Sequence, residues 1–426
     1  MTIFITAVSA ASGSNASDQI PGGPQKRPII IRNATLHTVS DATIEDGSLL
    51  FQNGKISSMG VSIPFPGDSE TIEGKGLHIY PGLMDSYSSI GLIEIDSIRA
   101  SIDTTETGNL NPNVRAAVAF NPDSEAIPVA RANGVLSSVV VPSGGLVAGR
   151  AAVMMHDGWT WESMTIKADV GMVVNWPRFA RTRARFQREE AESNESDRLG
   201  PLHEFMREVK AYSRARKTAP QDQPIDLRLD AMLKVIDGTT PIMVLANSVK
   251  QIQTAIAFAK QYDLKMILVG GADAMHCVNL IKEAKIPVVI SSTYRLPSRH
   301  DAAYDEAYAL PSVLQNAGIP FSIGADGRFG ASNVRNLPYH AASAAAFGLT
   351  QEQALRAITL SPAEIFGVSD QMGSLNVGKD ATIIITNGNI LETPTQVVKA
   401  FVQGRSVDLT SKHTQLNEKY TAKYKQ

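Results

Sequence analysis

Asp326 is the residue best placed to do chemistry, because it lies in Ile323-Gly-Ala-Asp-Gly327 directly after a short apolar segment. A carboxylate at the end of a buried strand can act as a general base for water or as a metal ligand. An Asp-Gly pair is also a common turn, and the residues alone leave both interpretations open. His300 lies in a polar loop, residues 295–301, that follows another apolar segment. We expect it on the same face as Asp326, together with Arg328.

The histidines do not form a metal-binding pattern. None of the eight shows an HxH, HxxxH or HExxH spacing, which would direct two imidazoles at one ion. The single cysteine, Cys277, excludes an internal disulfide and a multi-cysteine metal site. We therefore interpret the histidines other than His300 as scattered surface or satisfied core residues: His37, His78, His156, His203, His276, His340 and His413.

The elements that position these residues alternate between short apolar segments and helical ones from about residue 81 to 368. Strands of a buried parallel sheet are apolar on both faces, and Ile252, Ile256 and Ala259 show the spacing of an amphipathic helix. This βα repeat predicts an α/β fold, a (β/α)8 TIM-type barrel, which places its chemistry at the C-terminal ends of the strands. A doubly wound sheet is the alternative. The predicted strands are residues 135–141, 242–246, 266–269, 288–290 and 321–324.

Both ends of the chain are rich in strand and turn signals instead, including a hairpin at Asn53-Gly54. Neither end offers enough strands for its own core. We expect residues 27–80 and 369–412 to form one small β-sandwich domain, which a doubly wound sheet would not explain. The barrel would then occupy residues 81–368.

Three further segments lie outside these units. Residues 178–218 are dense in Arg and Glu and predict a charged helical insert with a solvated face. Residues 413–426 form a polar tail. Residues 1–26 run from a short apolar stretch into small and polar residues, which indicates either a disordered tail or the remnant of a signal peptide. The second interpretation predicts a periplasmic or secreted protein, and the first a cytoplasmic one.

The overall composition limits the classes of binding partner that we expect. The chain of 426 residues has a formal charge of −2, so it has no long-range field that would attract nucleic acid or an anionic membrane. No run of about 18 apolar residues predicts a membrane helix. We expect a small-molecule or peptide ligand, no nucleic acid and no membrane.

Residues 81–89, Pro-Gly-Leu-Met-Asp-Ser-Tyr-Ser-Ser, resemble the first-strand motif PG-[LF]-[IV]-D-x-H-x-H of the amidohydrolase superfamily. Residues 373–381 resemble its C-terminal signature. The resemblance implies a barrel with a composite β domain that hydrolyses C–N bonds of amides, cyclic amides or peptides at a divalent metal such as zinc. Its metal ligands are two His of the first strand, two His of middle strands and an Asp of the last, and the metal activates water. Residues 111–115, 157–162, 333–338 and 357–363 resemble the imidazolonepropionase-like branch.

The chain departs from this pattern at the metal ligands. Tyr87 and Ser89 stand at the two first-strand His positions. Leu245 and Gly270 stand at the mid-barrel His positions. Only Asp326 matches, and zinc sites use three or four protein ligands. We therefore expect no metal cofactor.

Three hypotheses follow. The first is a catalytically inactive barrel, a pseudoenzyme, that binds a ligand or a partner, either as a homo-oligomer or as the structural subunit of a complex with an active paralogue. The second is a metal-independent hydrolase with Asp326 as general base. The third is a structural role through the charged insert. For the first two, the candidate binding residues at the barrel mouth are Tyr87, Ser89, His300 and Arg328.

Overall fold

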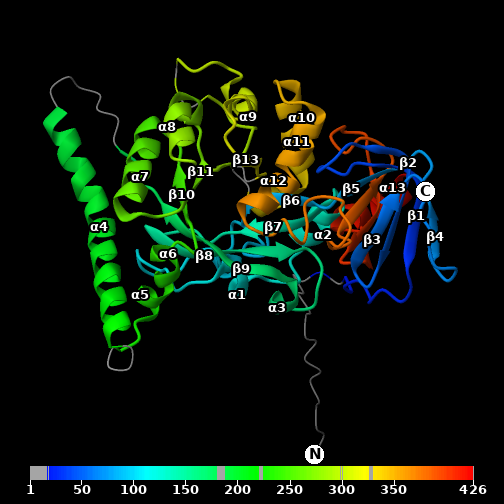
Figure 1. The fold of residues 1–426 in the computed structure, drawn as a ribbon, viewed down its shortest axis with the longest axis horizontal. Coiled ribbons are helices and arrows are strands. Elements are labelled where there is room, and N and C mark those ends of the chain that lie inside the picture. The colour runs from blue at the N-terminus through cyan, green and yellow to red at the C-terminus, as the bar shows by residue number, and fades with distance from the viewer. Residues whose placement is uncertain are drawn as a thin grey trace, which may run out of the picture.

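The computed structural model describes residues 17, 19–179, 188–219, 224–297, 299, 301–325 and 330–425, with backbone alone for 188–197. Two sheets of eight strands dominate it. One sheet curls into a barrel surrounded by helices, and the other lies at the opposite end of the molecule from the long helix α4 (Figure 1).

The first sheet is a nearly closed barrel whose strands follow the order of the chain. Side chains of the first strand bridge the remaining gap, because Ser86 Oγ donates to the carbonyl oxygen of Ile323 at 3.1 Å. The eight-stranded barrel of the sequence-based prediction is confirmed in outline. Its strands are β6 (Leu83–Ser88), β7 (Val135–Val140), β8 (Val147–Met155), β9 (Thr165–Asn175), β10 (Ile242–Ala246), β11 (Met266–Gly270), β12 (Val288–Ile290) and β13 (Phe321–Ile323).

One strand departs from a (β/α)8 barrel. β8 pairs antiparallel with both β7 and β9, whereas the other neighbouring pairs are parallel. The physical reason is the connection from β7, which is only residues 141–146. A parallel crossover needs a dozen or more residues. Gly144 and Gly145, both at positive φ, allow the chain to reverse here, so β7 is followed by a strand and not by the helix that a βα repeat would place after it.

Alternate side chains of the barrel strands point inward and form a closed apolar interior that includes Val139, Val173, Met243 and Val289. The outward side chains pack against the helices in the main core. The helices are α1 (Ala116–Ala119), α2 (Ala126–Arg131), α3 (Trp161–Met164), α4 (Arg188–Thr218), α5 (Leu227–Ala231), α6 (Leu233–Ile236), α7 (Val249–Tyr262), α8 (Val278–Glu283), α9 (Glu306–Ala317), α10 (Leu337–Ala346), α11 (Gln351–Ala357), α12 (Leu360–Ile365) and α13 (Lys412–Tyr424), with 3-10 turns η1 (Arg99–Ser101), η2 (Ala274–Cys277) and η3 (Gly330–Asn336).

The helix α7 shows how local sequence sets these elements. Ser248 and Gln251 form a reciprocal capping box at its start, and Asp263 ends it in the left-handed conformation. Ile252, Ile256 and Ala259 are buried, as their spacing predicts.

The second sheet combines both ends of the chain. β5 near the N-terminus pairs with β14 near the C-terminus, with Ile79 opposite Ile385. All eight strands belong to one hydrogen-bonded sheet, so the two facing sheets of the predicted sandwich are not confirmed. The strands are β1 (Ile29–Leu36), β2 (Ile44–Gln52), β3 (Lys55–Gly60), β4 (Glu70–Glu73), β5 (His78–Pro81), β14 (Ile383–Thr386), β15 (Val397–Val402) and β16 (Arg405–Val407).

The charge density of residues 178–218 predicts exposed helices, but the structure has one long helix, α4, with a buried face. Phe205, Met206 and Val209 are at most 2% exposed and belong to the main core. His203 Nδ1 also lies 2.8 Å from the hydroxyl of Tyr262 on α7. The part of α4 whose side chains the structure describes, residues 198–218, is therefore packed against the barrel.

The two termini differ in what the structure describes. The tail forms α13, whose side chains are almost all exposed. Residues 1–16 and 18, on which the signal-peptide hypothesis rests, lie outside the described residues. None of the helices in the described part of the chain is both long and apolar enough to span a bilayer.

Candidate functional site

A cavity of about 630 Å³ opens at the C-terminal ends of β9, β10 and β11. Its polar wall contains Asn175 at the end of β9, Asn247 just after β10, Asp273 just after β11, and Arg299 from the loop between β12 and α9. This is the end of a barrel at which enzymes of this architecture place their sites. The remaining lining residues are Trp176, Arg178, Phe179, Leu245, Ser248, Gln251 and Ala272.

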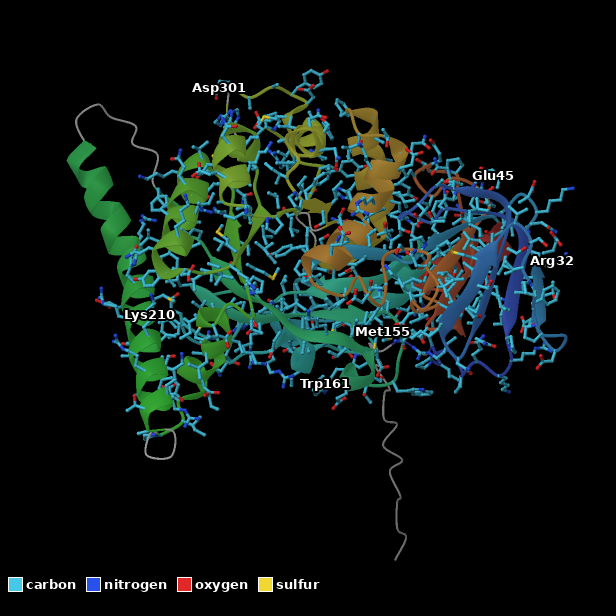
Figure 2. All side chains as sticks on the ribbon, viewed as in Figure 1. Arg32, Glu45, Met155, Trp161, Lys210 and Asp301 are labelled. Atoms are coloured by element: carbon cyan, nitrogen blue, oxygen red, sulfur yellow. The ribbon has the colours of Figure 1, made fainter. Side chains whose placement is uncertain are left out.

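The guanidinium of Arg299 is held by three carboxylates. Its Nη1 lies 3.5 Å from Asp273 Oδ1, its Nη2 3.7 Å from Glu306 Oε2, and its Nε 3.2 Å from Asp301 Oδ1. Asp273 and Glu306 are buried. In Figure 2, Asp301 lies at the outer edge of the barrel half, far from Glu45 and Arg32 of the second sheet. Two buried acids thus fix an arginine at the wall of the cavity.

His276 completes this cluster. Arg299 Nη2 lies 2.9 Å from His276 Nε2 and is the donor of this pair, because a guanidinium has no acceptor. The acceptor nitrogen lies 3.7 Å from Glu306 Oε1. The arginine therefore lies between the imidazole of His276 and the carboxylate of Glu306.

A second arginine fastens the same loop to β11. Arg295 Nη2 donates to the carbonyl oxygen of Ala272 at 2.9 Å. Burial lowers the pKa of Arg295, and the negative charges of Glu306 and Asp273 counteract this effect. The loop after β12 is thereby held against the residues that follow β11.

Gly270, at the end of β11, has no room for a side chain. Its φ is +90°, and a Cβ atom would lie 2.5 Å from Asn247 Oδ1. Asn247 Oδ1 also accepts a hydrogen bond from the N–H of Ala272 at 3.3 Å. The carboxamide of Asn247 therefore occupies the space into which a side chain at position 270 would extend.

The other walls are set by β9 and β10. Asn175 Nδ2 donates to the carbonyl oxygen of Gly145 at 2.8 Å, which ties the end of β9 to the turn before β8. Leu245 is half-buried and lines the cavity from β10. It is opposite Asn175 in the strand register, so an apolar and a polar side chain lie next to each other on the wall.

Of the five predicted site residues, Asp326, His300 and Arg328 lie outside the described residues. Tyr87 is buried in the apolar barrel interior, and Ser89 is half-buried just after β6. Neither lines the cavity beside Arg299. The structure therefore does not bring the described candidates into this cavity.

Sequence reasoning missed Asn175, Asn247, Asp273 and Arg299. All but Arg299 lie at, or within three residues of, the C-terminal end of a barrel strand. The rule that singled out Asp326, a polar residue at the end of a predicted strand, also applies to Asn247 and Asp273. Arg299 adjoins His300 in the loop that the prediction did select.

Among the described residues, the side chains at the mouth do not make up the set of zinc ligands that the resemblance implies. Leu245 and Gly270, which stand where the resemblance places the mid-barrel histidines, offer no donor atom. The Asn247 carboxamide would also obstruct a larger residue at position 270. Within the described ranges, no group of three or more His, Cys, Asp or Glu side chains is arranged to hold a metal ion.

Residues 253–410 match the model of the amidohydrolase family. The amidohydrolase tasK of Hapsidospora irregularis is 22% identical over 453 residues, which cover 93% of this chain and 44% of the relative. The chain thus spans less than half the length of that curated relative.

Solved structures share the fold. An amidohydrolase from Thermotoga maritima MSB8 superimposes with a TM-score of 0.78 at 25% identity, covering 89% of this chain and 99% of the other. A prolidase in complex with N-methylphosphonate-L-proline gives 0.54 at 14% identity, with coverage of 89% and 99%. Molinate hydrolase gives 0.53 at 13% identity, with coverage of 92% and 96%.

Proposed function

We propose that this chain, which belongs to the amidohydrolase superfamily, binds a small polar molecule or a peptide end at its barrel mouth and does so without a catalytic metal. The superfamily membership supplies the barrel and the location of the site. The departure from the family concerns the metal. Both parts of the proposal rest on the side chains at the C-terminal ends of β10 and β11.

The observation that carries the proposal is the contact between Gly270 and Asn247. A zinc site needs three or four protein ligands in fixed geometry. Position 270 has a positive φ and its side-chain space is filled by the Asn247 carboxamide, while Leu245 presents hydrocarbon to the cavity. A histidine at position 270 would therefore have to adopt a positive φ, and the Asn247 carboxamide would have to move aside for it.

The wall of the cavity favours a ligand that carries a carbonyl or carboxylate group and a polar donor. Arg299 supplies a fixed guanidinium, Asp273 a carboxylate, and Asn247 a carboxamide on the same wall. Phe179 and Leu245 supply apolar surface. The volume of about 630 Å³ is that of a small-ligand site. Amides and dipeptides have this combination of groups.

Elemental analysis of the purified protein, together with a panel of amides and dipeptides, tests this proposal. We expect no stoichiometric transition metal and no turnover, but saturable binding of one class of the panel by calorimetry. The matched variants are Arg299→Lys, which removes the planar fork at the cavity wall, and Arg207→Lys on the exposed side of α4. Only the first is expected to weaken binding. Stoichiometric zinc together with hydrolysis would overturn the proposal.

A metal-independent hydrolase is the second candidate, with Asp326 as general base for water. It is favoured by the anchoring of Ala325, whose N–H donates to Asp85 Oδ1 at 3.0 Å. Asp326 is therefore the next residue in the chain after a backbone position that is fixed just beyond the end of β13. Here Asp326→Asn would abolish a hydrolytic activity that persists after treatment with chelators. An activity unchanged in that variant would exclude this mechanism.

A further inference from the structure

The base of the barrel, at the opposite ends of the strands from the mouth, carries a long groove. One cavity of about 560 Å³ lies where β9 to β12 begin and where α7, α8 and α12 end. A second cavity of about 570 Å³ continues along the start of β13. The two share the lining residues Pro287, Glu364 and Ile365, so they adjoin each other, and together they make up the groove.

The floor of the groove is apolar. Ile286 and Phe366 are buried, and Ile365, where the two cavities meet, is half-buried. Each cavity alone has the volume of a small-ligand site. Because they are joined end to end, the groove suits an extended chain segment better than a compact molecule.

The rim of the groove is basic. Lys260 at the end of α7, Lys265 before β11 and Lys285 before β12 are exposed. Among the described residues, Lys265 and Lys285 make no ion pair with an acidic side chain. Within the same part of the chain, Lys260 makes one ion pair, with Glu283 at 3.6 Å, and Glu283 does not line the groove. Lys265 and Lys285 are therefore available to the charges of a partner, whereas Lys260 would share its charge with Glu283.

Two of the three acids that line the groove are already neutralised. Both Glu364 oxygens lie 2.7 Å from Arg356 Nη2. Asp169 lies 3.0 Å from Arg150 and within 4 Å of two more cations, Arg115 and Lys234. The third, Asp263, caps the end of α7. The charge that remains for a partner to meet is positive.

Lysines near helix ends also offset the negative end of the helix dipole. This effect accounts for Lys260, which lies in the last turn of α7. It does not account for Lys265, which lies beyond the end of α7 and directly precedes β11. The same effect covers Lys285, which follows the C-cap of α8, so Lys265 is the rim lysine that the helix dipoles leave unexplained.

We propose that this groove docks an acidic segment of a partner protein in extended conformation, with apolar side chains on the groove floor and carboxylates on the lysine rim. An extended segment presents alternate side chains to opposite sides, so a sequence alternating acidic and apolar residues matches both features. The docking surface lies at the opposite end of the barrel from the ligand cavity. A partner bound there leaves the mouth open.

Fluorescence anisotropy with a labelled peptide of alternating glutamate and leucine tests the proposal. The same peptide with glutamine in place of glutamate, and one with lysine, are the ligand controls. We expect the acidic peptide alone to bind, with an affinity that decreases as salt is raised, because exposed charge pairs are screened. The triple variant Lys260→Glu/Lys265→Glu/Lys285→Glu is expected to lose about tenfold or more in affinity, since three attractions become repulsions.

The matched control is Lys282→Glu/Lys412→Glu/Lys423→Glu, which changes the net charge equally at exposed positions outside the groove. It is expected to bind nearly as tightly as the unmodified protein. The milder variant Lys265→Gln/Lys285→Gln keeps the experiment decisive if the triple variant does not fold, and circular dichroism checks each fold. No binding of the acidic peptide, equal binding of the glutamine peptide, or equal loss in both triple variants would overturn the proposal.

Discussion

Asp85 Oδ1 accepts a hydrogen bond from the backbone N–H of Ala325 at 3.0 Å, and so joins the first strand of the barrel to the residue that follows the last. The same oxygen accepts from the N–H of Tyr87 at 3.3 Å. Asp85 is fully buried, so the carboxylate is part of the barrel closure. Two mouth residues of the prediction, Tyr87 and Asp326, are adjacent to this closure in the chain.

Removing this carboxylate is expected to destabilise the barrel. Asp85→Ala leaves two buried N–H groups without their acceptor, so the free energy of unfolding should fall by about 2–4 kcal/mol. Urea unfolding measures the difference. Ser89→Ala, just after the end of the same strand and half-buried, should change it by less than about 0.5 kcal/mol. Equal effects in the two variants would show that the bridge contributes nothing.

Gly270 offers a second test, with Gly318 as its partner variant. Both have positive φ, but a Cβ at Gly318 would meet no atom within 4 Å, whereas at Gly270 it would lie 2.5 Å from Asn247 Oδ1. Gly318→Ala should therefore cost about 1 kcal/mol of stability from backbone conformation alone. Gly270→Ala should cost clearly more, and Asn247→Ala in the same chain should recover part of the difference. Thermal unfolding that ranks the two glycine variants equally would contradict the steric argument.

Stability should also depend on pH through His340. Burial lowers the pKa of His340 to about 4 from 6.5, and its Nδ1 lies 3.0 Å from Thr293 Oγ1. Between these pH values the unfolded chain binds more protons than the folded chain. The contribution of His340 to the free energy of unfolding is therefore fully present above pH 6.5. It is lost as the pH falls toward 4, and the loss is on the order of 3 kcal/mol.

The measurement is urea unfolding at a series of pH values for the unmodified protein and for His340→Gln. The variant should show a shallower decline between pH 6.5 and 4, even if it is less stable throughout. His156, whose pKa burial also lowers to about 4, keeps the decline from vanishing. Parallel curves for the two proteins would exclude His340 as a contributor.

The network around Arg299 predicts a further contrast in stability. Arg299→Met leaves the buried carboxylates of Asp273 and Glu306 without their guanidinium, and should lower the free energy of unfolding by about 1–3 kcal/mol. Arg207→Met removes an arginine whose side chain is 68% exposed and whose ion pair among the described residues is with Glu204 at 3.8 Å. That change should fall within about 0.5 kcal/mol. Chemical denaturation of the two variants side by side checks the prediction, which fails if they are equally stable.

The barrel strands were largely predictable because a parallel sheet buried on both faces leaves continuous apolar runs. The predicted strand 242–246 coincides with β10, and 288–290 with β12. The antiparallel β8 escaped this rule, although the short connection of residues 141–146 carried the signal. In α4 the abundance of Arg and Glu concealed Phe205 and Val209, whose i, i+4 spacing marks a buried face.

The mouth cavity was harder to predict than the fold. Asn247 matters because its carboxamide occupies the space beside Gly270, a contact between two strand ends that no local pattern encodes. Arg299 is fixed by Asp273, which comes from a different connection of the barrel. Such arrangements depend on which connections meet at the strand ends, and that is determined only once the barrel closes.

The pairing of β5 with β14 has a consequence for synthesis of the chain. Ile79 leaves the ribosome about three hundred residues before its partner Ile385, at a translation rate of roughly 5–20 residues per second. During that interval β5 keeps an open hydrogen-bonding edge, which is a template for aggregation. Cotranslational folding of the barrel between these strands would hold the two ends near each other, so that β14 can pair with the open edge of β5 once it has been synthesised.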